Sequence, residues 1–402
     1  MFDNKLKKIK LHAIVVITFS FVFLRAVIPA GIADLSFLVM LCFFIPKIKF
    51  SKHNLVLPMV IILFLFSVLV SAIAHADSIN IMDLIRISVY SFVAISIVGL
   101  SQAINQEKEI FIYMMRIFLI VVAVYSVIVV VAFILFYMNI SVLGLHDLLY
   151  IRRSIARASG LADNPNYYSF SMFFAFVIAF FAYKLQRISK IVLAIIFLGG
   201  LISLSRGFIL SVIIFTFVYA SLSFSSPTMK FKGKYTVNLI FTFFVSFLIY
   251  LSSQYDWVIS ETLQKIFLRF SDGGGGAGAR LESVTNWYQF GTNYHWQLLL
   301  GNGSDFFREL SSTNNAAHNT YIRILGEFGL PSLIAFLLSL VVSGRLSIRK
   351  LDMFSSSVIL SLAVLIFTND YYLVRETWLI MAFLYIAPSL QVNDKSGVNL
   401  NG

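Results

Sequence analysis

Long apolar runs, broken by short polar stretches, follow one another along nearly the whole chain. A helix that crosses a membrane needs about 20 predominantly apolar residues, so the pattern is typical of a polytopic membrane protein. It predicts about twelve transmembrane helices. They are expected at 12–31, 34–46, 55–75, 82–104, 110–138, 166–183, 191–204, 207–223, 236–253, 321–343, 354–368 and 372–390.

Composition agrees with the pattern. Hydrophobic residues make up 59% of the 402 residues and charged residues 12%, whereas a soluble domain has about 45–50% apolar and about 25% charged residues. This excludes a soluble enzyme with one core, a disordered chain and a disulfide scaffold. Twelve spans would use about 240 residues, which leaves little room for a soluble domain. We therefore expect residues 1–402 to form a single all-α transmembrane domain.

The basic residues set the predicted orientation. They cluster before the first span and again at 47–52, 184–190, 230–234 and 345–350. With twelve spans all these clusters fall on one side, and the positive-inside rule makes that side cytoplasmic. Both termini are then cytoplasmic. The formal charge of +12 is explained in this way by the lipid bilayer, without nucleic acid as a partner.

Two long segments are predicted on the opposite, external side, at 139–165 and 254–320. The second is too long for a simple connector, which indicates a functional segment. It contains a glycine run at 273–276 and an aromatic stretch at 287–296 that suits a helix lying in the membrane interface.

Arginines in these external regions run against the positive-inside rule and need a reason. Arginine is suited to bidentate contacts with phosphate or carboxylate, so a cluster beside the bilayer suggests a lipid-linked phosphate or pyrophosphate. The alternative is anchoring to lipid headgroups, which serves equally well for Arg152, Arg153 and Arg269 taken singly. The arginines concerned are Arg152, Arg153, Arg157, Arg206, Arg269 and Arg280.

His318 is the histidine with the most distinctive setting, in Ala-Ala-His-Asn-Thr-Tyr at the start of the tenth predicted span. If this stretch is helical, His318, Ile322 and Leu325 share one face. A histidine at the membrane surface can accept a proton near neutral pH. A polar residue at a helix start, without chemistry, explains it equally well. No tight spacing of carboxylates or histidines predicts a metal site, and no cofactor is expected.

Arg25, Arg86 and Arg116 lie within predicted spans and suggest a different class of protein. Charges inside a membrane often serve transport, so a carrier such as a flippase for a lipid-linked glycan is an alternative to an enzyme. Acidic partners at mid-depth are nearly absent from the sequence, which argues against a proton relay. A noncatalytic assembly subunit is the third possibility.

Several ordered motifs resemble the superfamily of O-antigen polymerases and O-antigen ligases. They are Ser205-Arg-Gly207 between two apolar runs, Gly278-Ala-Arg-Leu-Glu282 before an aromatic stretch, Leu300-Gly-Asn-Gly303, Ala317-His-Asn-Thr-Tyr321 and Gly326-Glu-Phe-Gly-Leu330. The resemblance covers about 160–345 by motif and the whole chain by topology. Each motif alone is weak, but their order is fairly specific.

The resemblance implies a GT-C-like membrane glycosyltransferase. Such an enzyme of the bacterial inner membrane transfers a glycan from an undecaprenyl-diphosphate carrier on the periplasmic face. Arg206 and Arg280 would hold the donor pyrophosphate and His318 would act at the acceptor. Asn319 and Glu327 also match the pattern, and the resemblance places them among the substrate-binding residues. A chain-length regulator and a flippase are the implied protein partners.

The resemblance covers both branches of the superfamily. A polymerase joins lipid-linked repeat units, whereas a ligase moves the glycan onto lipid A–core. Arg280 and Gly291 are separated by ten residues, a spacing that resembles polymerase loops, but Arg152, Arg153 and Arg157 have no matching glycine. We favour the polymerase, with the ligase as the alternative.

Overall fold

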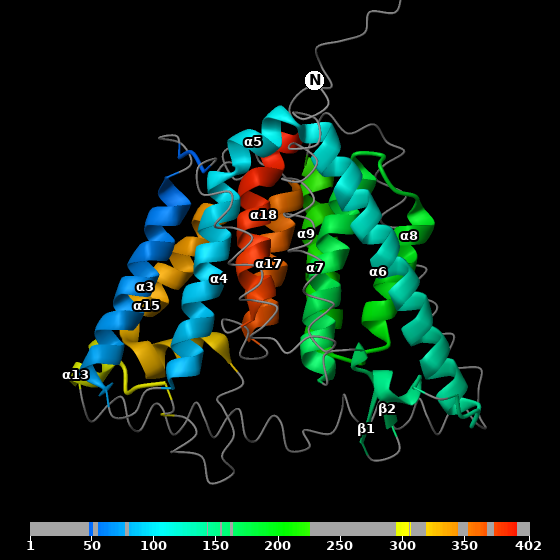
Figure 1. Ribbon diagram of the computed structural model, residues 1–402, viewed down its shortest axis with the longest axis horizontal. Coiled ribbons are helices and arrows are strands. Elements are labelled where there is room, and N and C mark those ends of the chain that lie inside the picture. The colour runs from blue at the N-terminus through cyan, green and yellow to red at the C-terminus, as the bar shows by residue number, and fades with distance from the viewer. Residues whose placement is uncertain are drawn as a thin grey trace, which may run out of the picture.

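A computed structural model describes residues 48–50, 55–76, 80–142, 144–152, 155–160, 164–225, 295–304, 306, 319–344, 353–367 and 374–391. Over these residues the chain is a bundle of long helices that run roughly side by side (Figure 1). The spans predicted at 12–31, 34–46 and 236–253 lie outside the described residues.

Every predicted span within the described residues coincides with a helix. Five of these helices, α3, α4, α6, α7 and α15, are long and apolar enough to cross a membrane. The prediction of an all-α, multi-pass membrane protein is thereby confirmed, while the total of twelve spans stays a prediction. The helices are α3 (Val56–Ala74), α4 (Ile81–Gly99), α6 (Lys108–Tyr137), α7 (Pro165–Lys184), α8 (Lys190–Leu201), α9 (Arg206–Ser225), α15 (Thr320–Ser343), α17 (Met353–Phe367) and α18 (Arg375–Gln391).

Shorter elements lie at the ends of the bundle. Helix α5 (Ser101–Gln106) joins α4 to α6, and α13 (His295–Leu300) packs against α15. Between α6 and α7 the chain forms a 3₁₀ turn, η3 (His146–Leu148), and an antiparallel hairpin of β1 (Leu149–Arg152) and β2 (Ile155–Ala158). The sequence analysis predicted a long external segment here but no strands.

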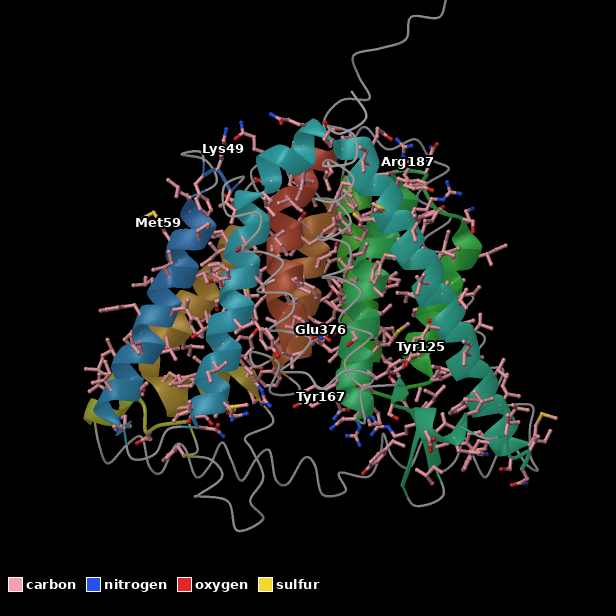
Figure 2. The ribbon with its side chains drawn as sticks, in the orientation of Figure 1. Lys49, Met59, Tyr125, Tyr167, Arg187 and Glu376 are labelled. Atoms are coloured by element: carbon pink, nitrogen blue, oxygen red, sulfur yellow. The ribbon has the colours of Figure 1, made fainter. Side chains whose placement is uncertain are left out.

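The two ends of the bundle differ in character. Lys49 and Arg187 lie at one end, which we call the basic end (Figure 2). The β1–β2 hairpin and α13 lie at the other, which we call the hairpin end (Figure 1). The shared position of Lys49 and Arg187 is what the predicted topology requires of the basic clusters at 47–52 and 184–190. Helices α4, α7, α9, α15 and α18 all begin at the hairpin end.

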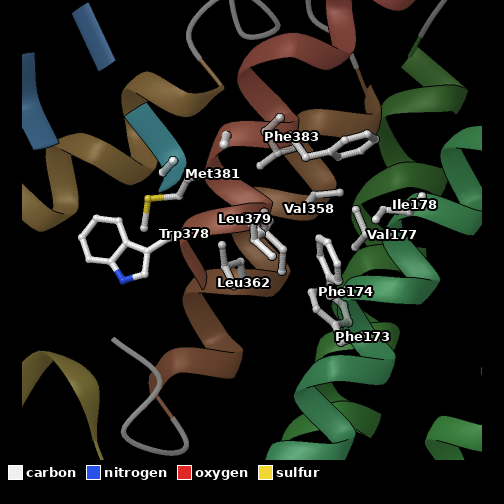
Figure 3. Packing of buried hydrophobic residues seen from close by; sticks show 14 of the residues in the cluster. Phe173, Phe174, Val177, Ile178, Val358, Leu362, Trp378, Leu379, Met381 and Phe383 are labelled. Atoms are coloured by element: carbon white, nitrogen blue, oxygen red, sulfur yellow. The ribbon is translucent and has the colours of Figure 1, made fainter. Parts of the chain in front are cut away.

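The core lies around α7 and α18, whose side chains are mostly buried. Figure 3 shows Phe174 of α7 and Leu379 of α18 filling the space between these two helices. Trp378 packs against Phe64 of α3 and Phe336 of α15, with ring centroids 5.4 and 6.1 Å apart. By contrast, α3 and α6 expose long apolar faces, as expected of outer helices that face lipid.

Candidate functional site

A break in α15 creates a docking point for other parts of the chain. Gly329 has φ 83° and ψ 175°, outside the helical region, and Pro331 follows two residues later. Proline has no N–H, so the carbonyl of Glu327 lacks its regular helical donor. The Ser71 hydroxyl and the Gly303 amide both donate to that carbonyl, each at 3.1 Å. The break thus joins α3 and the Gly301–Gly303 turn to α15.

Glycine is required on both sides of this contact. Gly301 has φ 76° and Gly329 has φ 83°, a region that suits glycine. A Cβ on Gly301 would lie 2.3 Å from the Glu327 carbonyl oxygen, and a Cβ on Gly329 would lie 2.1 Å from the Leu299 carbonyl oxygen. The turn and the helix break therefore pack backbone against backbone, as one unit.

Polar side chains secure the same turn. The Asn302 amide donates to the carbonyl of Gly326 at 3.0 Å. Ser304 accepts a hydrogen bond from the backbone N–H of Asn80, and the Asn80 side chain caps α4 by accepting from the Met82 amide at 3.1 Å. The turn after α13 is consequently tied to α4 as well as to α3 and α15.

A buried cluster of charges lies beside this unit. Arg323 donates from Nε to Glu327 Oε1 at 2.7 Å and approaches Asp83 Oδ2 through Nη2 at 3.4 Å. These three residues are at most 3% exposed. Arg86, whose side chain is half exposed, reaches Asp83 at 3.3 Å. Because buried charges are costly unless they are paired, the cluster fixes α15 against α4, and the structure places the Glu327 carboxylate in this internal ion pair.

Asn319 is buried and caps α15. Its side-chain oxygen accepts from the amides of Tyr321 at 3.0 Å and Ile322 at 3.2 Å. Its backbone is extended, with φ −148° and ψ 114°, so the helix begins at Thr320. The shared helical face of His318, Ile322 and Leu325 was expected only if this stretch is helical, and the described helix instead begins at Thr320 after the Asn319 cap. His318 itself lies outside the described residues.

The external arginines divide into two groups. Arg206 is the first residue of α9 and is exposed, whereas Arg157 lies on β2 and is 6% exposed. Arg157 donates from Nε to the carbonyl of Ser203 at 3.0 Å and from Nη2 to Asn166 Oδ1 at 3.3 Å. The structure thus brings Arg157 to the short link that precedes Arg206.

The remaining predicted arginines lie on β1 or outside the described residues. Arg152 ends β1, and the structure describes its backbone. Arg153, Arg269, Arg280 and the predicted interfacial helix before α13 lie outside the described residues. Their proximity to Arg206 stays a prediction.

The electrostatics of the hairpin end favour anions. Helices α4, α7, α9, α15 and α18 begin there, and the start of a helix carries a partial positive charge. Asn80, Asn164 and Asn319 cap three of them, α4, α7 and α15. With the exposed guanidinium of Arg206 at the start of α9, this end can attract a phosphate or pyrophosphate group.

Sequence reasoning missed two buried charged groups. Asp83 and Arg323 were overlooked, although Arg323 and Glu327 stand four residues apart on a helix, a spacing that permits an ion pair. The other group is on α18, where Glu376 is 2% exposed and accepts from the Ser171 hydroxyl at 2.5 Å. Asp83 is distant in sequence from Arg323, and Ser171 is distant from Glu376, so only the fold reveals these two contacts.

The described residues also bear on the carrier interpretation. Arg86 is paired with Asp83 near the start of α4, and Arg116 is exposed on α6. Both side chains are exposed, and neither is part of the buried core around α7 and α18. Arg25 lies outside the described residues.

Within the described part of the chain, no group of three histidine, cysteine or acidic residues could hold a metal ion.

Comparison with known proteins does not assign the chain to a family. No model of a known protein family matches the chain, and no curated protein matches it. The likeness to O-antigen polymerases and ligases rests on the motifs quoted above.

Proposed function

We propose that this protein is a surface-polysaccharide polymerase of the bacterial inner membrane. It joins undecaprenyl-diphosphate-linked repeat units on the periplasmic face by metal-independent glycosyl transfer. The observation that carries the proposal is the packing of the Gly301–Gly303 turn on the α15 break at Gly326–Gly329. Two motifs of the resemblance meet there and hold α15, which begins two residues after His318.

The chemistry follows from the residues in proposed roles. The acceptor hydroxyl attacks the anomeric carbon of the donor, and the bond from that carbon to the pyrophosphate oxygen breaks. His318 takes the hydroxyl proton. Negative charge grows on the departing undecaprenyl diphosphate, and the guanidinium groups of Arg206 and Arg280 stabilise it most in the transition state. Direct displacement inverts the configuration at the anomeric carbon.

The placement of charge supports this assignment. The hairpin end, with Arg206 and the starts of α4, α7, α9, α15 and α18, would face the periplasm, where lipid-linked units are polymerised. The basic end, with Lys49 and Arg187, would face the cytoplasm, in agreement with the positive-inside rule. We also propose that the complete set of about twelve transmembrane helices has a GT-C-like arrangement.

Complementation tests the proposal. A deletion strain carrying Arg206→Ala, Arg280→Ala or His318→Ala should make no long-chain glycan, while membrane levels of each variant stay normal. Arg187→Ala is the matched control, since Arg187 is an exposed arginine at the opposite end, and it should restore wild-type chain length. Normal chain length in all three site variants would contradict the proposal.

A further inference from the structure

The link between α8 and α9 is held from several sides. The amide of Ala158 on β2 donates to the carbonyl of Ile202 at 3.0 Å. One residue earlier on the strand, Arg157 donates to the carbonyl of Ser203 at 3.0 Å. Two successive carbonyls of the link therefore receive donors from two successive residues of β2.

The link is also constrained from within. Leu204 has φ 50°, a conformation that few leucines adopt. The Ser203 hydroxyl donates to the carbonyl of Gly200 at 2.6 Å and accepts from the amide of Ser205 at 3.3 Å. A strained backbone of this kind persists only where its surroundings hold it, and Arg157 supplies part of that hold.

The Arg157 guanidinium joins three elements. It comes from β2, contacts the α8–α9 link through Ser203 and reaches Asn166 in the first turn of α7. Its 6% exposure leaves little of it available to a ligand. Arg206, three residues after Ser203, is exposed at the start of α9.

From this geometry we infer that Arg157 is a positioning residue: its buried guanidinium fixes the α8–α9 link and so sets where Arg206 presents its charge. The inference rests on the proposed function only in taking the ligand of Arg206 to be a lipid-linked pyrophosphate. It gives Arg157 a different role from the direct substrate contact expected from the sequence.

The first test measures, without any ligand, how strongly Arg157 restricts the α8–α9 link. Ser205 is buried, so in a Cys42→Ser background Ser205→Cys should react slowly with a maleimide. Adding Arg157→Gln should raise the labelling rate at least tenfold, because the shorter side chain removes the guanidinium that joins the link at Ser203 to Asn166. Adding Arg187→Gln, a change at the opposite end, should leave the rate unchanged. An unchanged rate with Arg157→Gln would overturn the inference whatever the protein's function.

The second test is a double-mutant cycle on affinity for undecaprenyl diphosphate, measured on the full-length protein in nanodiscs. Arg206→Gln and Arg157→Gln should each weaken binding about tenfold, equivalent to about 1.4 kcal/mol. The double variant should be no weaker than Arg206→Gln alone, because Arg157 acts through Arg206. Losses that multiply to about a hundredfold would show that Arg157 contacts the ligand itself and would overturn the inference.

The two tests separate the possible failures. Faster labelling together with no effect of Arg206→Gln on undecaprenyl diphosphate would overturn the assigned ligand, and with it the proposed function, while the hold of Arg157 on the link would stand. Unchanged labelling together with a loss of binding in Arg206→Gln would overturn the positioning role and leave the proposed function intact.

Discussion

Arg323 donates from Nε to the carboxylate of Glu327 at 2.7 Å, and both side chains are almost fully buried. They stand one helical turn apart, between the Asn319 cap and the break at Gly329. Asp83 on α4 adds a second carboxylate at 3.4 Å from Nη2. The segment of α15 that follows His318 is therefore fixed to α4 by charge and to the Gly301–Gly303 turn by backbone packing.

Removing Arg323 should destabilise the protein strongly. Arg323→Gln removes the cation that lies between the buried carboxylates of Glu327 and Asp83, although Asp83 keeps Arg86, and loss of one partner from a buried ion pair costs about 3–5 kcal/mol. Unfolding of the purified protein in nanodiscs measures the loss. Glu109→Gln is the control, because Glu109 pairs with Arg187 at 2.9 Å on the exposed surface, where a pair contributes about 0–1 kcal/mol. Equal losses in the two variants would contradict the account of the cluster.

The glycines at the α15 break should be intolerant of alanine. A Cβ on Gly301 or Gly329 meets a backbone carbonyl, and relieving such an overlap costs about 1–3 kcal/mol. Gly144→Ala is the control, since Gly144 also has a positive φ, 78°, but open space around it. That change should cost only the conformational penalty, about 1–2 kcal/mol. Unfolding free energies should rank Gly329→Ala and Gly301→Ala below Gly144→Ala.

Asn319 should support activity by capping the start of α15. Asn319→Asp and Asn319→Ser keep a side-chain oxygen that can accept from the Tyr321 and Ile322 amides, whereas Asn319→Ala removes it at a cost of about 1 kcal/mol. We expect glycan chain length in the deletion strain to survive the first two changes and to fall with Ala. If Asp and Ser were as inactive as Ala, Asn319 would instead contact the substrate.

Cysteine labelling tests the orientation. Cys42 is the chain's single cysteine, so a Cys42→Ser background is free of thiols. Ile151 on β1 and Lys184 at the end of α7 are both exposed and lie at opposite ends of the bundle. An impermeant maleimide added to intact spheroplasts should label Ile151→Cys and spare Lys184→Cys until the membrane is permeabilised. The reverse pattern would place the hairpin end in the cytoplasm.

Long apolar runs predicted the helices well because each run has to satisfy its own backbone hydrogen bonds within the membrane. The runs at 110–138 and 166–183, for example, correspond to α6 and α7 within two residues at each end. The β1–β2 hairpin escaped prediction because its two four-residue strands lack a strong alternating pattern, and contacts such as Ala158 with Ile202 stabilise it.

The site was predictable only in part. The glycine motifs at 301–303 and 326–329 were visible in the sequence, and the structure shows that they pack together. Asp83 could not be anticipated, since it lies 240 residues from Arg323. The burial of Arg157 could not be anticipated either, because it depends on the hairpin and on the α8–α9 link.

The most direct test of the central claim is the surface glycan of a strain that lacks this gene, resolved on a gel. The account predicts the loss of long chains and the appearance of lipid A–core that carries a single repeat unit, because transfer to the acceptor continues without polymerisation. Bare lipid A–core, with long glycan retained on the undecaprenyl carrier, would contradict the polymerase assignment and identify the protein as the ligase. An unchanged ladder of long chains would contradict both.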